Sequence, residues 1–118
     1  MNPGSLVVTP LPQADGLRKN RPALVLLRLP PFRDVLVCGV SSQLRFLVAD
    51  LDDLIQPGDE DFAGSGLVTA SVVRAGYLAA VPLSGIKGQI GTISPARYLR
   101  IMDRLTLYLR REAGLLPS

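Results

Sequence analysis

Residues 21–27 read Arg21-Pro22-Ala23-Leu24-Val25-Leu26-Leu27, a nearly continuous apolar run that opens on an arginine and a proline. A run of this length without alternating polar residues is typical of a β-strand that is buried on both faces. Pro22 lies at its beginning, where a strand tolerates a residue without an N–H group. After a break at Pro30-Pro31 a second run covers residues 35–40. The two runs predict a β-hairpin.

Shorter apolar runs lie on either side of this hairpin. Residues 6–8 predict a strand that ends at Pro10-Leu11-Pro12, followed by a polar turn over residues 13–20. Further strand-like segments are predicted at residues 44–48, 66–74, 77–81 and 88–93.

The end of the chain predicts one helix over about residues 95–112. Ser94 is suited to the N-cap, Pro95 to the first helical position and Gly114 to the residue that closes the helix. An apolar stripe at helical spacing is expected to pack on the sheet, and it consists of Tyr98, Ile101, Met102, Leu105, Tyr108 and Leu109. The fold class is therefore mainly β with a C-terminal α-helix, as a small half-open barrel or strongly twisted antiparallel sheet.

Length and composition set limits on the chemistry. The 118 residues, 47% of them apolar, predict a single domain over residues 1–118, with a core at about residues 4–111. Cys38 is the single cysteine and histidine is absent, so the common zinc ligand sets and the usual general base are absent too. We therefore expect no metal. The N-terminus does not read as a secretory signal, and the longest segment without a charged side chain has 14 residues, too short to span a membrane. A cytoplasmic protein is the simplest interpretation.

Charge is distributed unevenly along the chain. The net charge is +3, but six of the ten acidic residues lie between Asp50 and Asp61, which leaves 13 basic and four acidic residues elsewhere. A basic body suits a polyanion such as RNA, and the alternative is a solvated positive face without a partner. The segment 50–61 lacks the EF-hand spacing of calcium ligands, so we interpret it as a solvated loop.

Polar residues occur at the ends of three apolar strands. Arg21 opens the first strand, Ser41-Ser42-Gln43 follows the second, and Arg74 closes a later one. Because strand ends hold side chains firmly, these residues could form a preorganised set that faces one groove. The alternative is that each arginine caps its strand and contacts only water.

The order of these segments resembles the MazF/PemK family of toxin-antitoxin endoribonucleases. The resemblance runs from Gly4 to Leu109, and the matching segments are Gly4-Ser5-Leu6-Val7-Val8, Arg21-Pro22-Ala23-Leu24-Val25-Leu26, Val40-Ser41-Ser42-Gln43, Gly66-Leu67, Ser71-Val72-Val73-Arg74 and Ile90-Gly91-Thr92-Ile93-Ser94. It implies an SH3-like barrel of the MazF/PemK/CcdB type, a homodimer, and a growth inhibitor that is paired with a cognate antitoxin. It also implies cleavage of single-stranded RNA, usually mRNA, without metal or cofactor, to give a 2′,3′-cyclic phosphate and a 5′-hydroxyl.

The resemblance assigns catalytic roles to three residues. Arg21 matches the arginine that faces the scissile phosphate, Ser41 matches a hydroxyl that bonds to the same phosphate, and Arg74 matches an arginine that serves as acid or stabiliser. The sequence departs from the PemK pattern at Gly76, where an aspartate is expected. Asp15 is the nearest available carboxylate and is our candidate for the base. Its alternative role is that of a turn residue before Gly16.

A further set of residues is expected to bind RNA: Arg18, Lys19, Asn20, Ser42 and Gln43. With six Tyr and Phe residues and no Trp, an extensive aromatic stacking platform is not expected. A further hypothesis is that the acidic segment 50–61 folds over the basic groove as a partial lid. Two alternative functions remain at this point, namely a non-catalytic RNA-binding relative and a toxin of the same fold that poisons DNA gyrase.

Overall fold

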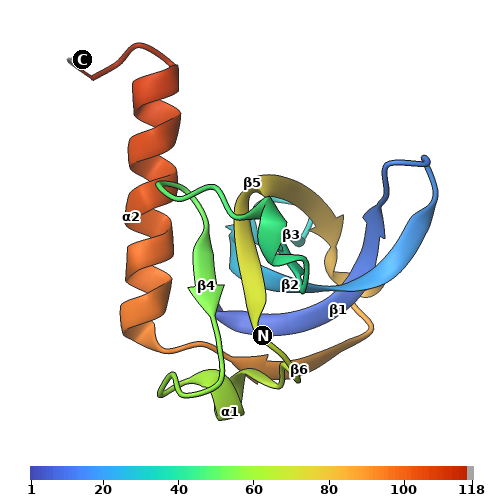
Figure 1. The fold of residues 1–118 in the computed structure, drawn as a ribbon. Helices are drawn as coiled ribbons and strands as arrows, with labels where there is room; N and C mark the ends of the chain where they lie inside the picture. Colours follow the sequence, from blue (N-terminus) through green and yellow to red (C-terminus); the bar gives the residue numbers. More distant parts are fainter. Residues whose placement is uncertain (117–118) are drawn as a thin grey trace.

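Residues 1–116, the part of the chain that the computed structural model describes, form a curled antiparallel sheet with a long helix beside it (Figure 1). The predicted domain extends two residues beyond this part. The strand order in the sheet is β4-β5-β3-β2-β1-β6. The strands are β1 (Ser5–Pro12), β2 (Arg18–Leu29), β3 (Asp34–Ser41), β4 (Asp53–Ile55), β5 (Ser71–Pro82) and β6 (Gly88–Thr92). The helices are α1 (Phe62–Ser65), α2 (Pro95–Glu112) and the 3-10 turns η1 (Leu44–Phe46) and η2 (Leu83–Gly85). The predicted fold class is confirmed.

Strand β2 is buried on both faces, as its sequence predicts. Residues 23–26 are at most 1% exposed. Leu24 belongs to a core that includes Ile101 of α2, whereas Val25 on the opposite face belongs to a second core with Val37 inside the curl of the sheet. The continuous apolar run of β2 is therefore explained by one core on each side of the strand.

Strand β1 does not end at its prolines, contrary to the prediction. Pro10 and Pro12 pair with β2, which begins at Arg18, so the polar turn is shorter than residues 13–20. The Lys87 N–H donates to the Val8 carbonyl at 2.8 Å, so even-numbered residues of β1 point their backbone groups toward β6. Pairing with β6 ends at Val8. The prolines therefore lie where no ladder donor is required.

Two other predicted strands differ in the structure. Residues 44–46 form the 3-10 turn η1 instead of a strand, because they lie on the surface and pair with no neighbouring strand. Residues 66–70 are also outside any strand, because Gly66 adopts a left-handed conformation with φ of +77° that ends α1. Strand β5 instead begins at Ser71 and continues without a break through residues 77–81.

Helix α2 begins as predicted, with Ser94 as the N-cap that accepts a hydrogen bond from the Arg97 N–H at 3.1 Å. Gly114, with φ of +74°, follows its end. Of the predicted apolar stripe, Ile101 and Leu105 are buried, but Leu109 is 50% exposed. The last turns of α2 extend past the edge of the sheet, which leaves this end of the stripe uncovered (Figure 1). No helix in residues 1–116 is long and apolar enough to cross a membrane.

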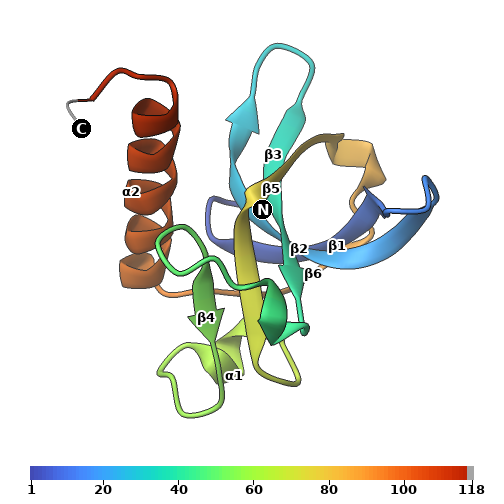
Figure 2. The same ribbon diagram turned by 45° about the horizontal axis from the view of Figure 1, so that its top comes forward.

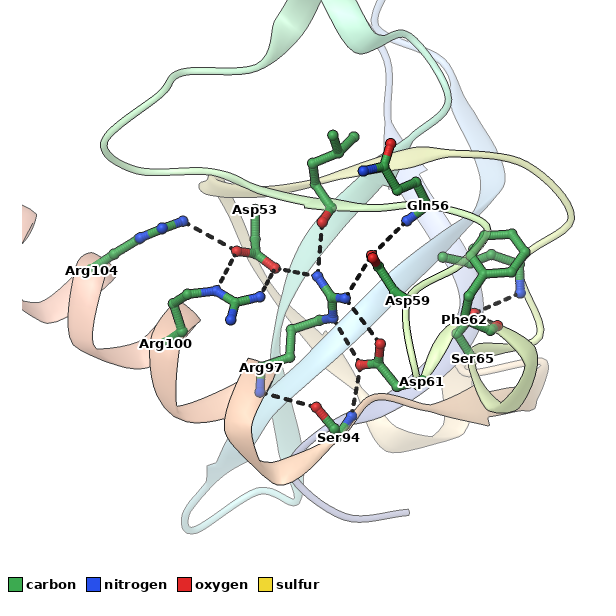
Figure 3. Close-up of polar contacts among 12 residues, drawn as sticks. Asp53, Gln56, Asp59, Asp61, Phe62, Ser65, Ser94, Arg97, Arg100 and Arg104 are labelled. Carbon is green, nitrogen blue, oxygen red and sulfur yellow. Dashed lines mark hydrogen bonds and ion pairs between the residues drawn. The ribbon is translucent and has the colours of Figure 1, made fainter.

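Six charged side chains connect α2 with the acidic segment (Figure 3). We call them the acidic–arginine cluster, and its members are Asp53, Asp59, Asp61, Arg97, Arg100 and Arg104. The buried Arg97 donates to Asp53 at 2.6 Å, to Asp59 at 2.9 Å, and twice to Asp61, at 2.8 and 2.9 Å. Its remaining N–H bonds to the Leu54 carbonyl at 2.8 Å. All five N–H groups of the guanidinium therefore have partners.

The prediction that residues 50–61 form a solvated loop is wrong. Asp53 is 4% exposed and accepts hydrogen bonds from Arg100 and Arg104 as well as from Arg97. Asp61 also accepts from the Ser94 N–H at 2.9 Å. The segment is ordered because its carboxylates pair with Arg97, Arg100 and Arg104 of α2.

The cluster shifts the pKa of its members in the direction expected for buried ion pairs. Hydrogen bonds from Arg97 lower the pKa of Asp61 from 3.8 to about 2. Burial alone would raise the pKa of Asp53, but hydrogen bonds from Arg100 and Arg97 outweigh it, and the net pKa is below 3.8. Both carboxylates are therefore negatively charged at neutral pH.

The cluster predicts a specific acid sensitivity. Because the pKa of Asp61 is lower in the folded state, its contribution to stability is complete above its unfolded pKa of 3.8 and is lost as the pH falls toward 2. We expect Asp61→Asn to lower the free energy of unfolding at pH 7 by about 3 kcal/mol and to flatten the decline between pH 5 and 2. Urea denaturation across this pH range measures both effects. The matched control is Asp103→Asn on the exposed face of α2, and an equal response of the two variants would contradict the prediction.

Candidate functional site

The register of three neighbouring strands brings the predicted polar residues together. Gly39 of β3 pairs with Ala23 of β2 on one side and with Arg74 of β5 on the other. Arg21 and Ser41 lie two positions beyond that row on β2 and β3, so they share the face of Arg74. All three line one groove of about 460 Å³. Ser42 and Gln43 line it as well.

The groove opens at one end of the core inside the curled sheet. Leu11 belongs both to this core and to the groove wall. The other walls are the start of β2, the end of β3, η1 and the segment between α1 and β5. The turn between β1 and β2 projects from the sheet on the side away from α2 (Figure 1 and Figure 2). The groove therefore lies beside the strand pair β1–β2 that extends beyond the sheet.

Arg21 and Ser41 present polar hydrogens to the groove. The exposed Arg21 donates one hydrogen bond from Nη2 to the Gln13 Oε1 at 3.3 Å. The Gln13 amide group is held in turn by the Leu11 carbonyl at 3.1 Å. The Ser41 Oγ accepts from the Gln43 N–H at 3.0 Å, so the hydroxyl hydrogen of Ser41 can be donated to a ligand.

Arg74 lies against two aromatic rings. Its guanidinium carbon is 5.0 Å from the centroid of the Phe46 ring and 5.4 Å from that of Tyr77. The Tyr77 hydroxyl donates a hydrogen bond to the Pro12 carbonyl. A Cβ on Gly39 would contact the Tyr77 ring at 3.4 Å, so the ring lies directly over this position of β3. Phe46 and Tyr77 are site residues that sequence reasoning missed.

The other predicted residues lie outside the groove lining. Arg18, Lys19 and Asn20 are exposed on β2, before Arg21, in the strand pair that extends beyond the sheet. The Asp15 carboxylate lies in the turn between β1 and β2, where it accepts from the Leu17 N–H at 2.9 Å. This bond is the turn geometry that the sequence offers as the alternative role for Asp15. Its role as a base stays a prediction.

No carboxylate occurs among the described residues that line the groove. A Cβ at Gly76 would meet the Leu51 side chain at 3.2 Å, and Gly76 is not in the lining. The acidic segment 50–61 does not line the groove either, and its buried carboxylates point to α2. The predicted lid is therefore wrong, because the segment packs against α2, where Asp53, Asp59 and Asp61 pair with arginines.

Two other chemical possibilities can be judged from the structure. Within residues 1–116, no group of three or more His, Cys, Asp or Glu side chains is arranged to hold a metal ion. Burial raises the pKa of the Cys38 thiol to about 12, so the thiol is protonated at neutral pH and is a poor nucleophile. The polar side chains that the groove presents to a ligand are therefore the guanidinium groups of Arg21 and Arg74, together with hydroxyl and amide groups.

Comparison with known families matches the chain to one of them. The family described as "PemK-like, MazF-like toxin of type II toxin-antitoxin system" matches residues 2–109. This chain belongs to that toxin family. Membership of a type II system implies an antitoxin partner for this PemK/MazF-like toxin.

A solved structure shows the same fold. The Mycobacterium tuberculosis toxin MazF-mt6 matches with a TM-score of 0.66 and 21% sequence identity, over 89% of this chain and 95% of that chain. No curated protein matches the chain in sequence. The curled sheet with a C-terminal helix is thus the MazF fold, and the groove of this PemK/MazF-like toxin is built on it.

Proposed function

We propose that this PemK/MazF-like toxin is an endoribonuclease that cuts single-stranded RNA, usually mRNA, at the groove of Arg21, Ser41 and Arg74. The observation that carries the proposal is the convergence of two guanidinium groups and one hydroxyl from three different strands on one groove. Planar guanidinium groups match the geometry of phosphate oxygens. The groove therefore has the donors that a phosphodiester requires.

The reaction is an attack within the RNA itself. The 2′-hydroxyl oxygen forms a bond to phosphorus and loses its proton, while the bond from phosphorus to the 5′-oxygen breaks and that oxygen gains a proton. The products are a 2′,3′-cyclic phosphate and a 5′-hydroxyl. Negative charge increases on the phosphate oxygens in the transition state, where Arg21 and Arg74 stabilise it and the Ser41 hydroxyl donates a neutral hydrogen bond.

The reaction is proposed to need no metal ion or cofactor. Negative charge that develops on a transferring phosphoryl group can be stabilised by guanidinium groups in place of metal ions. Arg21 and Arg74 bring two permanent positive charges to the groove, since arginine stays protonated in proteins.

RNA is proposed to follow β2 away from the groove. Arg18 and Lys19 are exposed on the strand that leads to Arg21, where they contact phosphates on one side of the cut. Asn20 is exposed between them and Arg21. Ser42 and Gln43 line the groove, where the Gln43 amide reads the edge of an unpaired base.

We further propose that the toxin acts in the cytoplasm as a homodimer that its antitoxin inhibits. Tyr108 and Leu109, at the uncovered end of the apolar stripe of α2, are 37% and 50% exposed and supply apolar surface to an interface. A cationic groove is complementary to an acidic segment of an antitoxin.

The first test is cleavage of a long single-stranded RNA in the presence of EDTA. We expect cutting to persist, with cyclic phosphates at the new 3′ ends. Arg21→Ala should lower the rate by a hundredfold or more, since one lost donor to a developing oxyanion costs about 3 kcal/mol. Arg28→Ala is the matched control on the same strand, because Arg28 is exposed and bonds only weakly to the Met1 carbonyl at 3.4 Å. RNA that stays intact with excess wild-type protein would refute the proposal.

A second candidate function is RNA binding without cleavage. The observation that favours it is the lack of a carboxylate among the described groove-lining residues, which leaves the proton of the 2′-hydroxyl without an acceptor in the groove. The cleavage test separates the two functions, because a protein that only binds RNA leaves the RNA intact. A binding measurement on the same RNA should then show an affinity that falls steeply with salt concentration.

The variant Asp15→Asn tests the proton acceptor. Its amide oxygen can still accept the Leu17 N–H, so the turn is kept while the basic carboxylate is lost. If Asp15 takes the proton, the cleavage rate should fall by about a hundredfold, which is a typical effect of a general base. An unchanged rate would remove Asp15 from the mechanism and leave charge stabilisation by Arg21 and Arg74.

A further inference from the structure

The two rings beside Arg74 come from separate segments of the chain. Phe46 ends η1, and Tyr77 lies in β5, three residues after Arg74. In a regular strand, residues three positions apart point to opposite faces of the sheet. Arg74 and Tyr77 nevertheless lie together, with the guanidinium carbon 5.4 Å from the ring centroid.

A bulge in β5 explains this arrangement. Cys38 pairs with Leu78 and the next residue, Gly39, pairs with Arg74, so residues 75–77 have no partners on β3. The extra residues turn the Tyr77 ring onto the face of Arg74, where it lies over Gly39. Such a bulge leaves backbone N–H groups that the sheet ladder does not satisfy.

The buried carboxylate of Asp52 bonds to both ring-bearing segments. Asp52 is 4% exposed and lies outside the acidic–arginine cluster. One of its oxygens accepts from the Ala75 N–H in the bulge at 3.0 Å, and the other accepts from the Val48 N–H, two residues after Phe46, at 2.9 Å. One side chain therefore fixes the spacing between the bulge and the segment of η1.

We propose that Phe46 and Tyr77 are positioning residues for Arg74, and that the Asp52 carboxylate fixes the two segments that carry them. The inference rests on the proposed function, because it concerns how Arg74 meets the scissile phosphate. Contact with ring faces restricts the rotamers of Arg74 before RNA binds and leaves the N–H groups at the edge of the guanidinium free for phosphate oxygens. The donor is thereby preorganised for the transition state.

Kinetics of ring variants test this role. Phe46→Leu and Tyr77→Leu should each lower kcat about fivefold, with KM for RNA unchanged. In the Arg74→Ala background, measured with protein in excess over RNA, neither substitution should lower the rate further, because the rings act through Arg74. Phe32→Leu is the matched control, since Phe32 is 83% exposed in the turn between β2 and β3.

NMR of the Arg74 side chain gives a readout that does not depend on cleavage. The ring currents of Phe46 and Tyr77 should shift its Nε–H resonance, and each ring variant should move that resonance toward the free-arginine position. Asp52→Asn keeps one acceptor oxygen and loses the other, so we expect it to shift the amide resonance of Val48 or Ala75 and that of the Arg74 side chain together.

The outcomes separate this inference from the proposed function. Ring variants that leave the Arg74 resonance unchanged, or that lower kcat equally with and without Arg74, would overturn the inference while RNA cleavage stands. Intact RNA with the wild-type protein would overturn the proposed function and with it the catalytic role of the rings. In that case the NMR shifts would still report whether the rings hold Arg74.

Discussion

The hydrogen bonds of the buried Arg97 guanidinium hold helix α2 against the acidic segment, and the contacts that support the groove begin there. The five hydrogen bonds of this guanidinium tie the start of α2 to the segment that contains β4. A buried charge of this kind is tolerated only when all its donors are satisfied, so removal of one of its three carboxylate partners leaves guanidinium N–H groups in the interior without an acceptor. Strand β4 in turn pairs with β5, and Asp52, just before β4, holds the bulge of β5. The groove is therefore supported through this chain of contacts from α2.

The same cluster determines where positive charge is available. The carboxylates of Asp53, Asp59 and Asp61 are bonded to arginines of α2 and are not free to approach the groove. Arg21 and Arg74 consequently face a groove whose described lining residues include no carboxylate. The acidic and basic residues that are unevenly distributed in the sequence are thus separated in the fold. The carboxylates pair with arginines of α2, and the groove keeps positive charge that suits a polyanion.

Local sequence patterns predict the elements of the fold but not the contacts between distant segments. The apolar run of β2 and the Ser94-Pro95 start of α2 are visible in the sequence because burial on two faces and helix capping are local properties. The sequence predicts Arg21, Ser41 and Arg74 at strand ends, and they do line one groove, but only Ser41 ends its strand. Arg21 and Arg74 lie inside β2 and β5, because both strands extend further than their apolar runs indicate. The partners of Arg97 lie 36 to 44 residues away in the chain, so the pattern gave no sign that the acidic segment is buried. The β5 bulge, and with it the position of Tyr77, depends on pairing with β3 and could not be predicted either.

A structure of the toxin with an RNA that carries a 2′-deoxynucleotide at the cut site tests the central claim most directly, because this substitution removes the attacking hydroxyl and keeps the phosphate. The scissile phosphate should lie in the groove, with its oxygens within hydrogen-bond distance of Arg21, Ser41 and Arg74. A scissile phosphate bound at the arginines of α2, or at any surface outside the groove, would contradict it.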